Sequence, residues 1–147
     1  MKTKKHPNKI PRRYIPLSLS KKDKKKQYAE IIRSRKAYKK GIFITRKRMR
    51  SFHSKKSSHV QRAKAMYNVD KITANSTLAK KTQCTRASLE AILRKGRGAY
   101  YSSGSRPNQT AESWARARLA SAITHGKASL VDKDILLKGC KPSSPVF

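Results

Sequence analysis

Apolar residues recur at helical spacing through the first half of the chain, but they are sparse among basic residues. The first helix that this spacing predicts covers about residues 21–39, with Ser20 as its N-cap and Gly41 just beyond its end. A second predicted helix covers residues 58–67. Between the two, the apolar run at residues 41–45 is too short to distinguish a strand from a buried connector.

The second half of the chain is richer in apolar positions and predicts several shorter helices. Residues 76–96 predict a short helix, a break at Gln83 and a second helix that Gly96 ends. A further helix is predicted at about residues 111–124, with Trp114 in its buried stripe, and a last short helix follows. We therefore expect a mainly α fold, a small body of about four to six short helices.

The helical hairpin at residues 76–96 has the outline of a helix-turn-helix motif. That motif usually has Gly at its turn because the backbone there is left-handed, whereas this chain has Gln83. If the motif reads DNA, its second helix would present Arg86, Ser88 and Arg94 to the groove. The alternative is a plain helical hairpin that packs only its own core.

Prolines at positions 7, 11 and 16 disfavour helix and predict an extended arm at the N-terminus. The predicted division has three parts: a basic arm with one amphipathic helix at 1–57, a small helical domain at 58–140 and a C-terminal tail at 141–147.

The net charge of the chain indicates what kind of partner it binds. The chain contains 38 Lys and Arg against 7 Asp and Glu, a net charge of +31. Residues 1–66 carry 24 of the basic and 2 of the acidic residues. Self-repulsion at this density opposes compaction, so we expect a polyanionic partner: nucleic acid, an acidic protein surface or an anionic membrane surface. The predicted contact residues are Arg12, Arg13, Lys21, Lys22, Lys24, Lys25, Lys26, Arg46, Lys47, Arg48, Arg50 and Arg106.

Catalytic, cofactor-binding and metal-binding residues are not predicted. Cys84 and Cys140 form no CxxC pair, and two reduced thiols are favoured over a disulfide. The four histidines are too scattered for zinc, and the glycine-rich stretch lacks the GxxxxGK[ST] spacing of a phosphate-binding loop. We expect neither an enzyme nor a small-molecule substrate. The sequence also predicts no secretory signal and no transmembrane segment.

The stretch KGRGAYYSSGSRPNQTAESWARARLAS at residues 95–121 stands apart from the surrounding charge. We expect Tyr100 and Tyr101 to pack against Trp114 as an organising cluster beneath a rigid loop. In the alternative interpretation, the amides of the loop and Arg106 bind a carboxylate or phosphate of a partner.

The signature GAYYSSGSRPNQT…SW…ARLAS, with the upstream run RYIPLSLSKKDKKKQYAEIIRSRKAYKKGIFITRKRMRSFHSKKSSHV, resembles a family of small, highly basic proteins of large DNA viruses. Chlorella viruses and other giant viruses encode this family, and the resemblance covers roughly residues 13–140. It implies a minor capsid protein on the inner side of the virion, made in an infected host cell. The implied partners are the major capsid protein and other minor capsid proteins.

Two functions are therefore open. The first is a structural component of a virion that cements capsomers through basic extended segments, as the resemblance implies. The second is a DNA-binding protein that either condenses the viral genome without sequence preference or regulates it through the helix-turn-helix-like segment.

Overall fold

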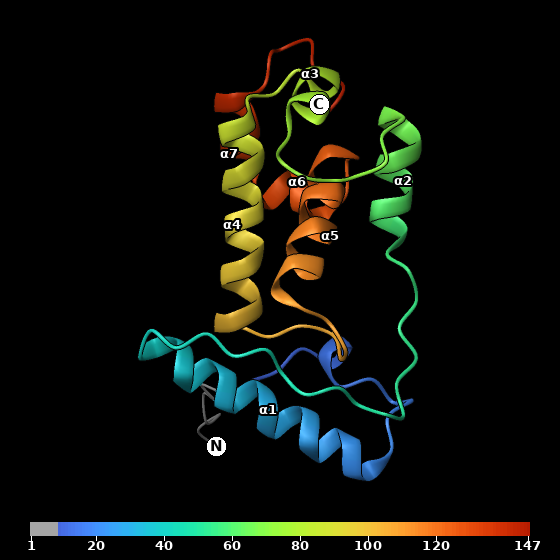
Figure 1. The fold of residues 1–147 in the computed structure, drawn as a ribbon, viewed down its shortest axis with the longest axis vertical. Coiled ribbons are helices and arrows are strands. Elements are labelled where there is room, and N and C mark those ends of the chain that lie inside the picture. The colour runs from blue at the N-terminus through green and yellow to red at the C-terminus, as the bar shows by residue number, and fades with distance from the viewer. Residues whose placement is uncertain (1–8) are drawn as a thin grey trace, which may run out of the picture. The chain divides into compact units, whose positions relative to one another are not determined.

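The computed structural model describes residues 9–147, and this part of the chain is mainly α-helical, as predicted (Figure 1). The chain forms two compact units. Unit 1 comprises the chain up to Ser54 together with Tyr101–Thr110. Unit 2 comprises Lys55–Tyr100 and Ala111–Phe147.

The two units do not coincide with the predicted division at residues 57 and 140. The segment Tyr101–Thr110 belongs to the same unit as the N-terminal segment, although it follows residue 100 in sequence. The last seven residues are not a separate tail, because Val146 is buried in the core of unit 2 and the hydroxyl of Ser144 donates to the carbonyl of Thr82.

Unit 1 is built around α1 (Lys21–Lys39), which follows a single 3-10 turn, η1 (Arg12–Tyr14). The hydroxyl of Ser20 accepts a hydrogen bond from the amide of Asp23 at 3.1 Å, which confirms the predicted N-cap. Gly41 is left-handed, with φ of 78°, and terminates the helix as predicted. Residues 41–45 are neither strand nor buried connector, because Ile42 and Phe43 are 54% and 65% exposed.

Unit 2 contains the other helices of residues 9–147. In Figure 1, α4 and α5 run side by side, and α2 lies along α5, against which it packs. The bounds of the helices are α2 (Ser58–Tyr67), α3 (Ser76–Thr82), α4 (Arg86–Ser102), α5 (Ala111–Ile123), α6 (Lys127–Val131) and α7 (Lys133–Gly139). The last two residues of α4 belong to unit 1.

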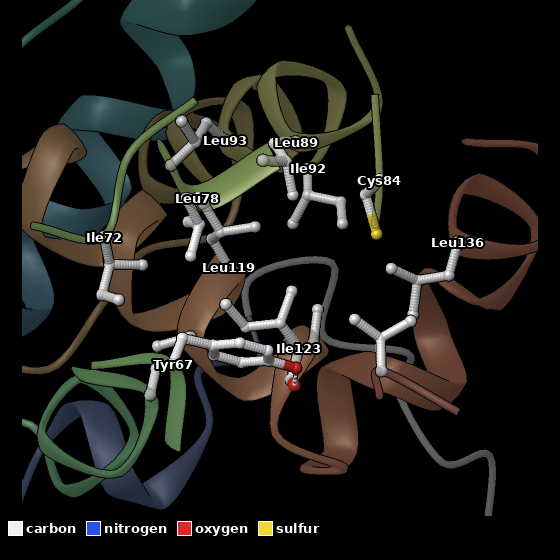
Figure 2. Packing of buried hydrophobic residues seen from close by; sticks show 14 of the residues in the cluster. Tyr67, Ile72, Leu78, Cys84, Leu89, Ile92, Leu93, Leu119, Ile123 and Leu136 are labelled. Carbon is white, nitrogen blue, oxygen red and sulfur yellow. Dashed lines mark hydrogen bonds between the residues drawn. The ribbon is translucent and has the colours of Figure 1, made fainter. Parts of the chain in front are cut away.

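The core of unit 2 is one mostly aliphatic cluster of buried side chains, which also includes Tyr67 (Figure 2). Leu78, Leu89, Ile92, Leu119 and Ile123 are fully buried within it. They come from α3, α4 and α5, so the same cluster holds these three helices together. Burial of each such side chain contributes roughly 1.5–3 kcal/mol of transfer free energy.

Helix α4 is longer than predicted, because Gly96 does not end it. Gly96 is buried where α4 meets α5, and a Cβ atom at this position would lie 2.6 Å from the Cα of Ala115. The glycine thus serves close helix packing and not a turn. The expectation of a stop at Gly96 was wrong because the sequence does not show which glycines face a neighbouring helix.

The two cysteines form a disulfide, with an S–S distance of 2.04 Å, and the prediction of two reduced thiols was therefore wrong. Cys84 lies between α3 and α4, and Cys140 follows α7. Backbone hydrogen bonds flank the pair: the amide of Thr85 donates to the carbonyl of Gly139, and the amide of Lys141 donates to the carbonyl of Gln83. The bridge therefore fastens the C-terminal segment to the α3–α4 hairpin.

Candidate nucleic-acid interface

The interior of unit 1 is largely polar. Gln27, on α1, is 1% exposed, and its side-chain amide donates to the carbonyl of Tyr14 at 3.1 Å and to that of Ser105 at 3.3 Å. Arg46 is also buried, and its guanidinium donates to the hydroxyl of Ser34 at 3.0 Å and to that of Ser105 at 2.7 Å. These bonds join the N-terminal segment, α1 and the returning loop into one network.

The loop Tyr101–Thr110 is a structural element of unit 1. The side chain of Asn108 accepts from the amide of Met49 at 2.6 Å and donates to the carbonyl of Phe52 at 3.0 Å. Gly104 has a φ of 129°, and a Cβ atom there would lie 3.2 Å from Ile31, so glycine satisfies both backbone and space. The loop is therefore fixed by hydrogen bonds from Asn108 to the segment at residues 49–52 and by packing of Gly104 against Ile31 on α1.

Both acidic residues of unit 1 are buried and take part in internal hydrogen bonds. Asp23 accepts from the hydroxyl of Ser51 at 2.5 Å and from its amide at 3.0 Å, and these bonds lower the pKa of Asp23. Burial disfavours the charged form of Glu30, but hydrogen bonds from Arg33 at 2.9 Å and from the amide of Lys47 lower the pKa of Glu30 overall. Both groups are therefore ionised near neutral pH without facing solvent.

The exposed charge of unit 1 is consequently of one sign among the described residues. The unit contains 21 basic and 2 acidic residues, and both acids are internal. We call its exposed basic side chains the basic surface: Lys9, Arg12, Arg13, Lys21, Lys22, Lys25, Lys26, Arg33, Lys36, Lys39, Lys40, Lys47, Arg48, Arg50 and Arg106.

Most of the predicted contact residues belong to this surface, with two exceptions. Lys24 is half-buried. Arg46 is 7% exposed and holds Ser34 and Ser105, so it is a structural residue and not available to a partner. Arg106 is exposed, but its neighbour Ser105 is internal. Sequence reasoning did not identify Gln27 as a core residue, because its partners lie far along the chain and leave no local pattern.

The turn of the α3–α4 hairpin has the left-handed residue that a helix-turn-helix motif requires. Gln83 is left-handed, with φ of 56°, although it is not glycine. The hydroxyl of Thr85 accepts from the amide of Ser88 and so caps the start of α4. Ser88 itself is buried and donates to the carbonyl of Thr85, so it is not available to a DNA groove and this part of the prediction was wrong. Arg86 and Arg94 are exposed.

The acidic residues of unit 2 are arranged differently from those of unit 1. Arg97 bonds to Glu112 at 2.5 Å and to Glu90 at 2.8 Å, and both carboxylates are partly exposed. These bonds raise the pKa of Arg97. Asp132 is buried and forms two bonds with Arg118, at 2.8 and 2.9 Å. The surface of unit 2 is therefore of mixed sign near α4, which is less favourable for phosphate.

The expected organising cluster is divided between the units. Tyr101 belongs to unit 1, where its ring lies near Tyr38 and Phe43, whereas Tyr100 and Trp114 belong to unit 2. Tyr100 is fully buried, but Trp114 is only half-buried and lies outside the aliphatic cluster. Unit 2 is therefore organised around aliphatic side chains and not around its single indole.

Two further properties bear on the kind of site. Over residues 9–147, His, Cys, Asp and Glu side chains do not gather in a group that could hold a metal ion. Within the same residues, every helix is too short or too polar to span a bilayer.

A mainly helical fold and a net charge of +31 define a class of small basic helical proteins. The chain belongs to the family described as "Family of unknown function (DUF5824)", whose match covers residues 11–137. The match therefore includes nearly all of both units. Neither the curated proteins nor the solved structures contain a match to the chain.

Proposed function

We propose that the basic surface of unit 1 binds the phosphate backbone of nucleic acid without reading base sequence. The observation that carries this proposal is the placement of the acids. Asp23 and Glu30 are both buried, so among the described residues of unit 1 the solvent-exposed charges are lysines and arginines, of which Arg33 is ion-paired with Glu30. A basic surface that served only solubility would not require Asp23 and Glu30 to be buried.

The shape of α1 suits a repeating polyanion. The helix has 19 residues and is therefore about 28 Å long. Exposed basic side chains follow it from Lys21 to Lys39, which gives a row of charges rather than a single pocket. Lysine predominates in the row, and lysine binds phosphate as a point charge. Phosphate contacts of this kind carry no sequence information.

The geometry gives less support to sequence-specific reading by the α3–α4 hairpin. Ser88 is buried, and Glu90 on the same helix is ion-paired with Arg97. Only Arg86 and Arg94 of the predicted groove-facing set are exposed. We therefore place the main contact on unit 1.

The test compares two triple variants of equal charge. Lys22, Lys25 and Lys26, all exposed on α1, are changed to Gln in one variant. Three exposed lysines of unit 2 are changed in the matched control: Lys64, Lys133 and Lys138. Binding to a short DNA duplex is measured by fluorescence anisotropy over a range of salt concentrations. Log affinity falls as log salt rises, and loss of two or three phosphate contacts should make this fall less steep by about 0.9 per contact.

We expect this loss in the α1 variant and a much smaller change in the control. Equal losses in both variants would mean that total charge, and not the basic surface, governs binding. A wild-type protein that binds duplexes of any sequence only weakly, but binds acidic protein or anionic vesicles tightly, would overturn the proposal.

The role in a virion that the resemblance implies stays a prediction. It would use the same basic surface, because acidic capsomer faces and phosphate groups attract the same cations. Extraction of purified particles tests it: a capsid component stays with nuclease-treated shells, whereas a genome-bound protein leaves with the DNA.

A further inference from the structure

Three aromatic rings of unit 1 gather beside the basic surface. The ring of Tyr101 is nearly parallel to that of Tyr38, with an interplanar angle of 10° and centroids 6.3 Å apart. It also lies 5.1 Å from the ring of Phe43, and Tyr38 and Phe43 are 5.9 Å apart. Phe43 is 65% exposed and Tyr38 is 36% exposed. We call these three residues the ring cluster.

The C-terminal cap of α1 places the first two rings together. The amide of Gly41 donates to the carbonyl of Tyr38, and the amide of Ile42 donates to the carbonyl of Ala37, each at 2.9 Å. These two bonds are those of a Schellman motif, which reverses the chain at the end of a helix. The reversal brings Phe43 back beside Tyr38. The position of Phe43 is thus fixed by backbone bonds and not by burial of its own ring.

The third ring, that of Tyr101, is positioned by hydrogen bonds from α1 to the backbone of residues 101–103. The hydroxyl of Ser34 donates to the carbonyl of Tyr101, and the guanidinium of Arg35 donates to the carbonyl of Ser103 at 2.8 Å. Ser34 in turn accepts from Arg46. The polar interior of unit 1 therefore fixes the backbone that carries Tyr101.

Basic residues flank the ring cluster in the chain. Lys36, Lys39 and Lys40 are exposed in the last turn of α1 and its cap, and Lys47 is exposed shortly after Phe43. An apolar protein partner that covered Phe43 would have to remove several of these lysines from water without paired acids. A single-stranded nucleic acid has no such conflict, because it offers bases to the rings and phosphates to the lysines.

We propose that the ring cluster is a stacking platform for the bases of single-stranded nucleic acid. This inference rests on the proposed binding of phosphate by unit 1 and adds the form of nucleic acid that the unit prefers. Exposed aromatic rings stack on any base because every base has a π face, so the preference is for unpaired bases and not for a sequence. In a duplex the faces of the bases are covered, and the platform makes no contact with them.

The test separates stacking from charge. Two strands of equal length are compared by anisotropy: an oligothymidylate and a strand of the same number of abasic sugar phosphates. Wild-type protein should bind the strand with bases about tenfold more tightly, and Phe43→Ala should remove most of that difference. Both proteins should bind the abasic strand equally, because their charges are the same.

The matched control is Tyr28→Ala. Tyr28 is also an exposed ring on α1, at 46%, but it lies outside the ring cluster. A Phe43→Trp variant, which restores a ring, should recover the preference, and circular dichroism of each variant should show an unchanged helix content.

Three results would overturn the inference. They are equal binding of the two strands by wild type, an equal loss in the Tyr28 and Phe43 variants, and failure of Phe43→Trp to recover the preference. In each case duplex binding can persist, and the proposed phosphate contact then stands alone. Absence of binding to every strand and duplex would instead remove the proposed function, and the ring-cluster inference with it.

Discussion

The two units differ in the chemistry of their interiors: that of unit 2 is mostly aliphatic and that of unit 1 is largely polar. Unit 2 buries one cluster of mostly aliphatic side chains. Unit 1 buries few of them, chiefly Leu19, Ile31 and Met49, and fills the remaining interior with hydrogen-bonded Gln27 and Arg46. An aliphatic core stabilises by area and tolerates small shifts, whereas a buried polar network requires every partner in place.

The same contrast extends to charge. Unit 1 has a net charge of +19 and unit 2 of +12, although unit 2 is larger. Each unit has a buried acid in an ion pair, Glu30 with Arg33 in unit 1 and Asp132 with Arg118 in unit 2. Self-repulsion is therefore greater in the unit that has the smaller aliphatic core. We expect unit 1 to gain more stability from a bound polyanion than unit 2 does.

The largest expected effect concerns the core of unit 2. Leu119 is fully buried, and Leu119→Ala should lower the free energy of unfolding by about 2–5 kcal/mol through lost transfer energy and a cavity. Chemical denaturation followed by circular dichroism measures the change. Leu130→Ala is the control, because this side chain is 76% exposed and its truncation should change stability by less than about 0.5 kcal/mol. Similar effects in both variants would contradict the assigned core.

Removal of the disulfide should have the next largest effect. Replacing Cys84 and Cys140 with Ala opens a loop that spans 56 residues and should destabilise unit 2 by about 2–4 kcal/mol. Differential scanning calorimetry with and without a reductant measures this loss. The double variant should be insensitive to the reductant. If the wild type were equally insensitive, with both thiols open to labelling, the bridge would be absent in solution.

The polar interior of unit 1 gives a third test. Arg46→Met leaves the hydroxyls of Ser34 and Ser105 without this buried donor and should cost about 1–3 kcal/mol. Amide hydrogen exchange in α1 reports on this unit directly. Arg48→Met removes the same charge from an exposed position and should leave exchange in α1 nearly unchanged.

The smallest expected effect is the response of unit 1 to acid. Asp23 and Glu30 have pKa values below their ordinary values of 3.8 and 4.5. Each carboxylate therefore stabilises the folded state fully above its ordinary value, and this contribution is lost as the pH falls through the lowered pKa. Protection of the α1 amides from hydrogen exchange, corrected for the intrinsic pH dependence of exchange, should fall below about pH 4. The Asp23→Asn, Glu30→Gln double variant should show a flatter profile, and an unchanged profile would rule these groups out as the cause.

Local signals in the sequence were sufficient for most helix positions. The caps at Ser20 and Thr85 and the stop at Gly41 act through residues three or four positions away, so a single sequence shows them. The bounds of α1 and α2 follow from such signals. The mixed charge around α4 was not foreseen, because the pairing of Arg97 with Glu112 joins two helices.

The candidate site was harder to predict, because its parts come together only in three dimensions. The partners of Gln27 and Arg46 in the loop lie 78 and 59 positions away, and no periodic pattern records them. Basic side chains could be listed from the sequence, but not the burial of Arg46 among them. The ring cluster was missed for the same reason, because Tyr38 and Tyr101 lie in the two separate segments of unit 1.

The discontinuity of unit 1 also determines when this unit can form during translation. Its first segment is synthesised before Ser105, by about 3–10 seconds at about 5–20 residues per second. Throughout that interval Gln27 and Arg46 lack their partner Ser105, while the first segment already carries 20 of the 21 basic residues of the unit. A peptide that ended at residue 57 would lack the second segment of unit 1, and with it Ser105. Its affinity for nucleic acid would describe a charged coil and not the folded surface.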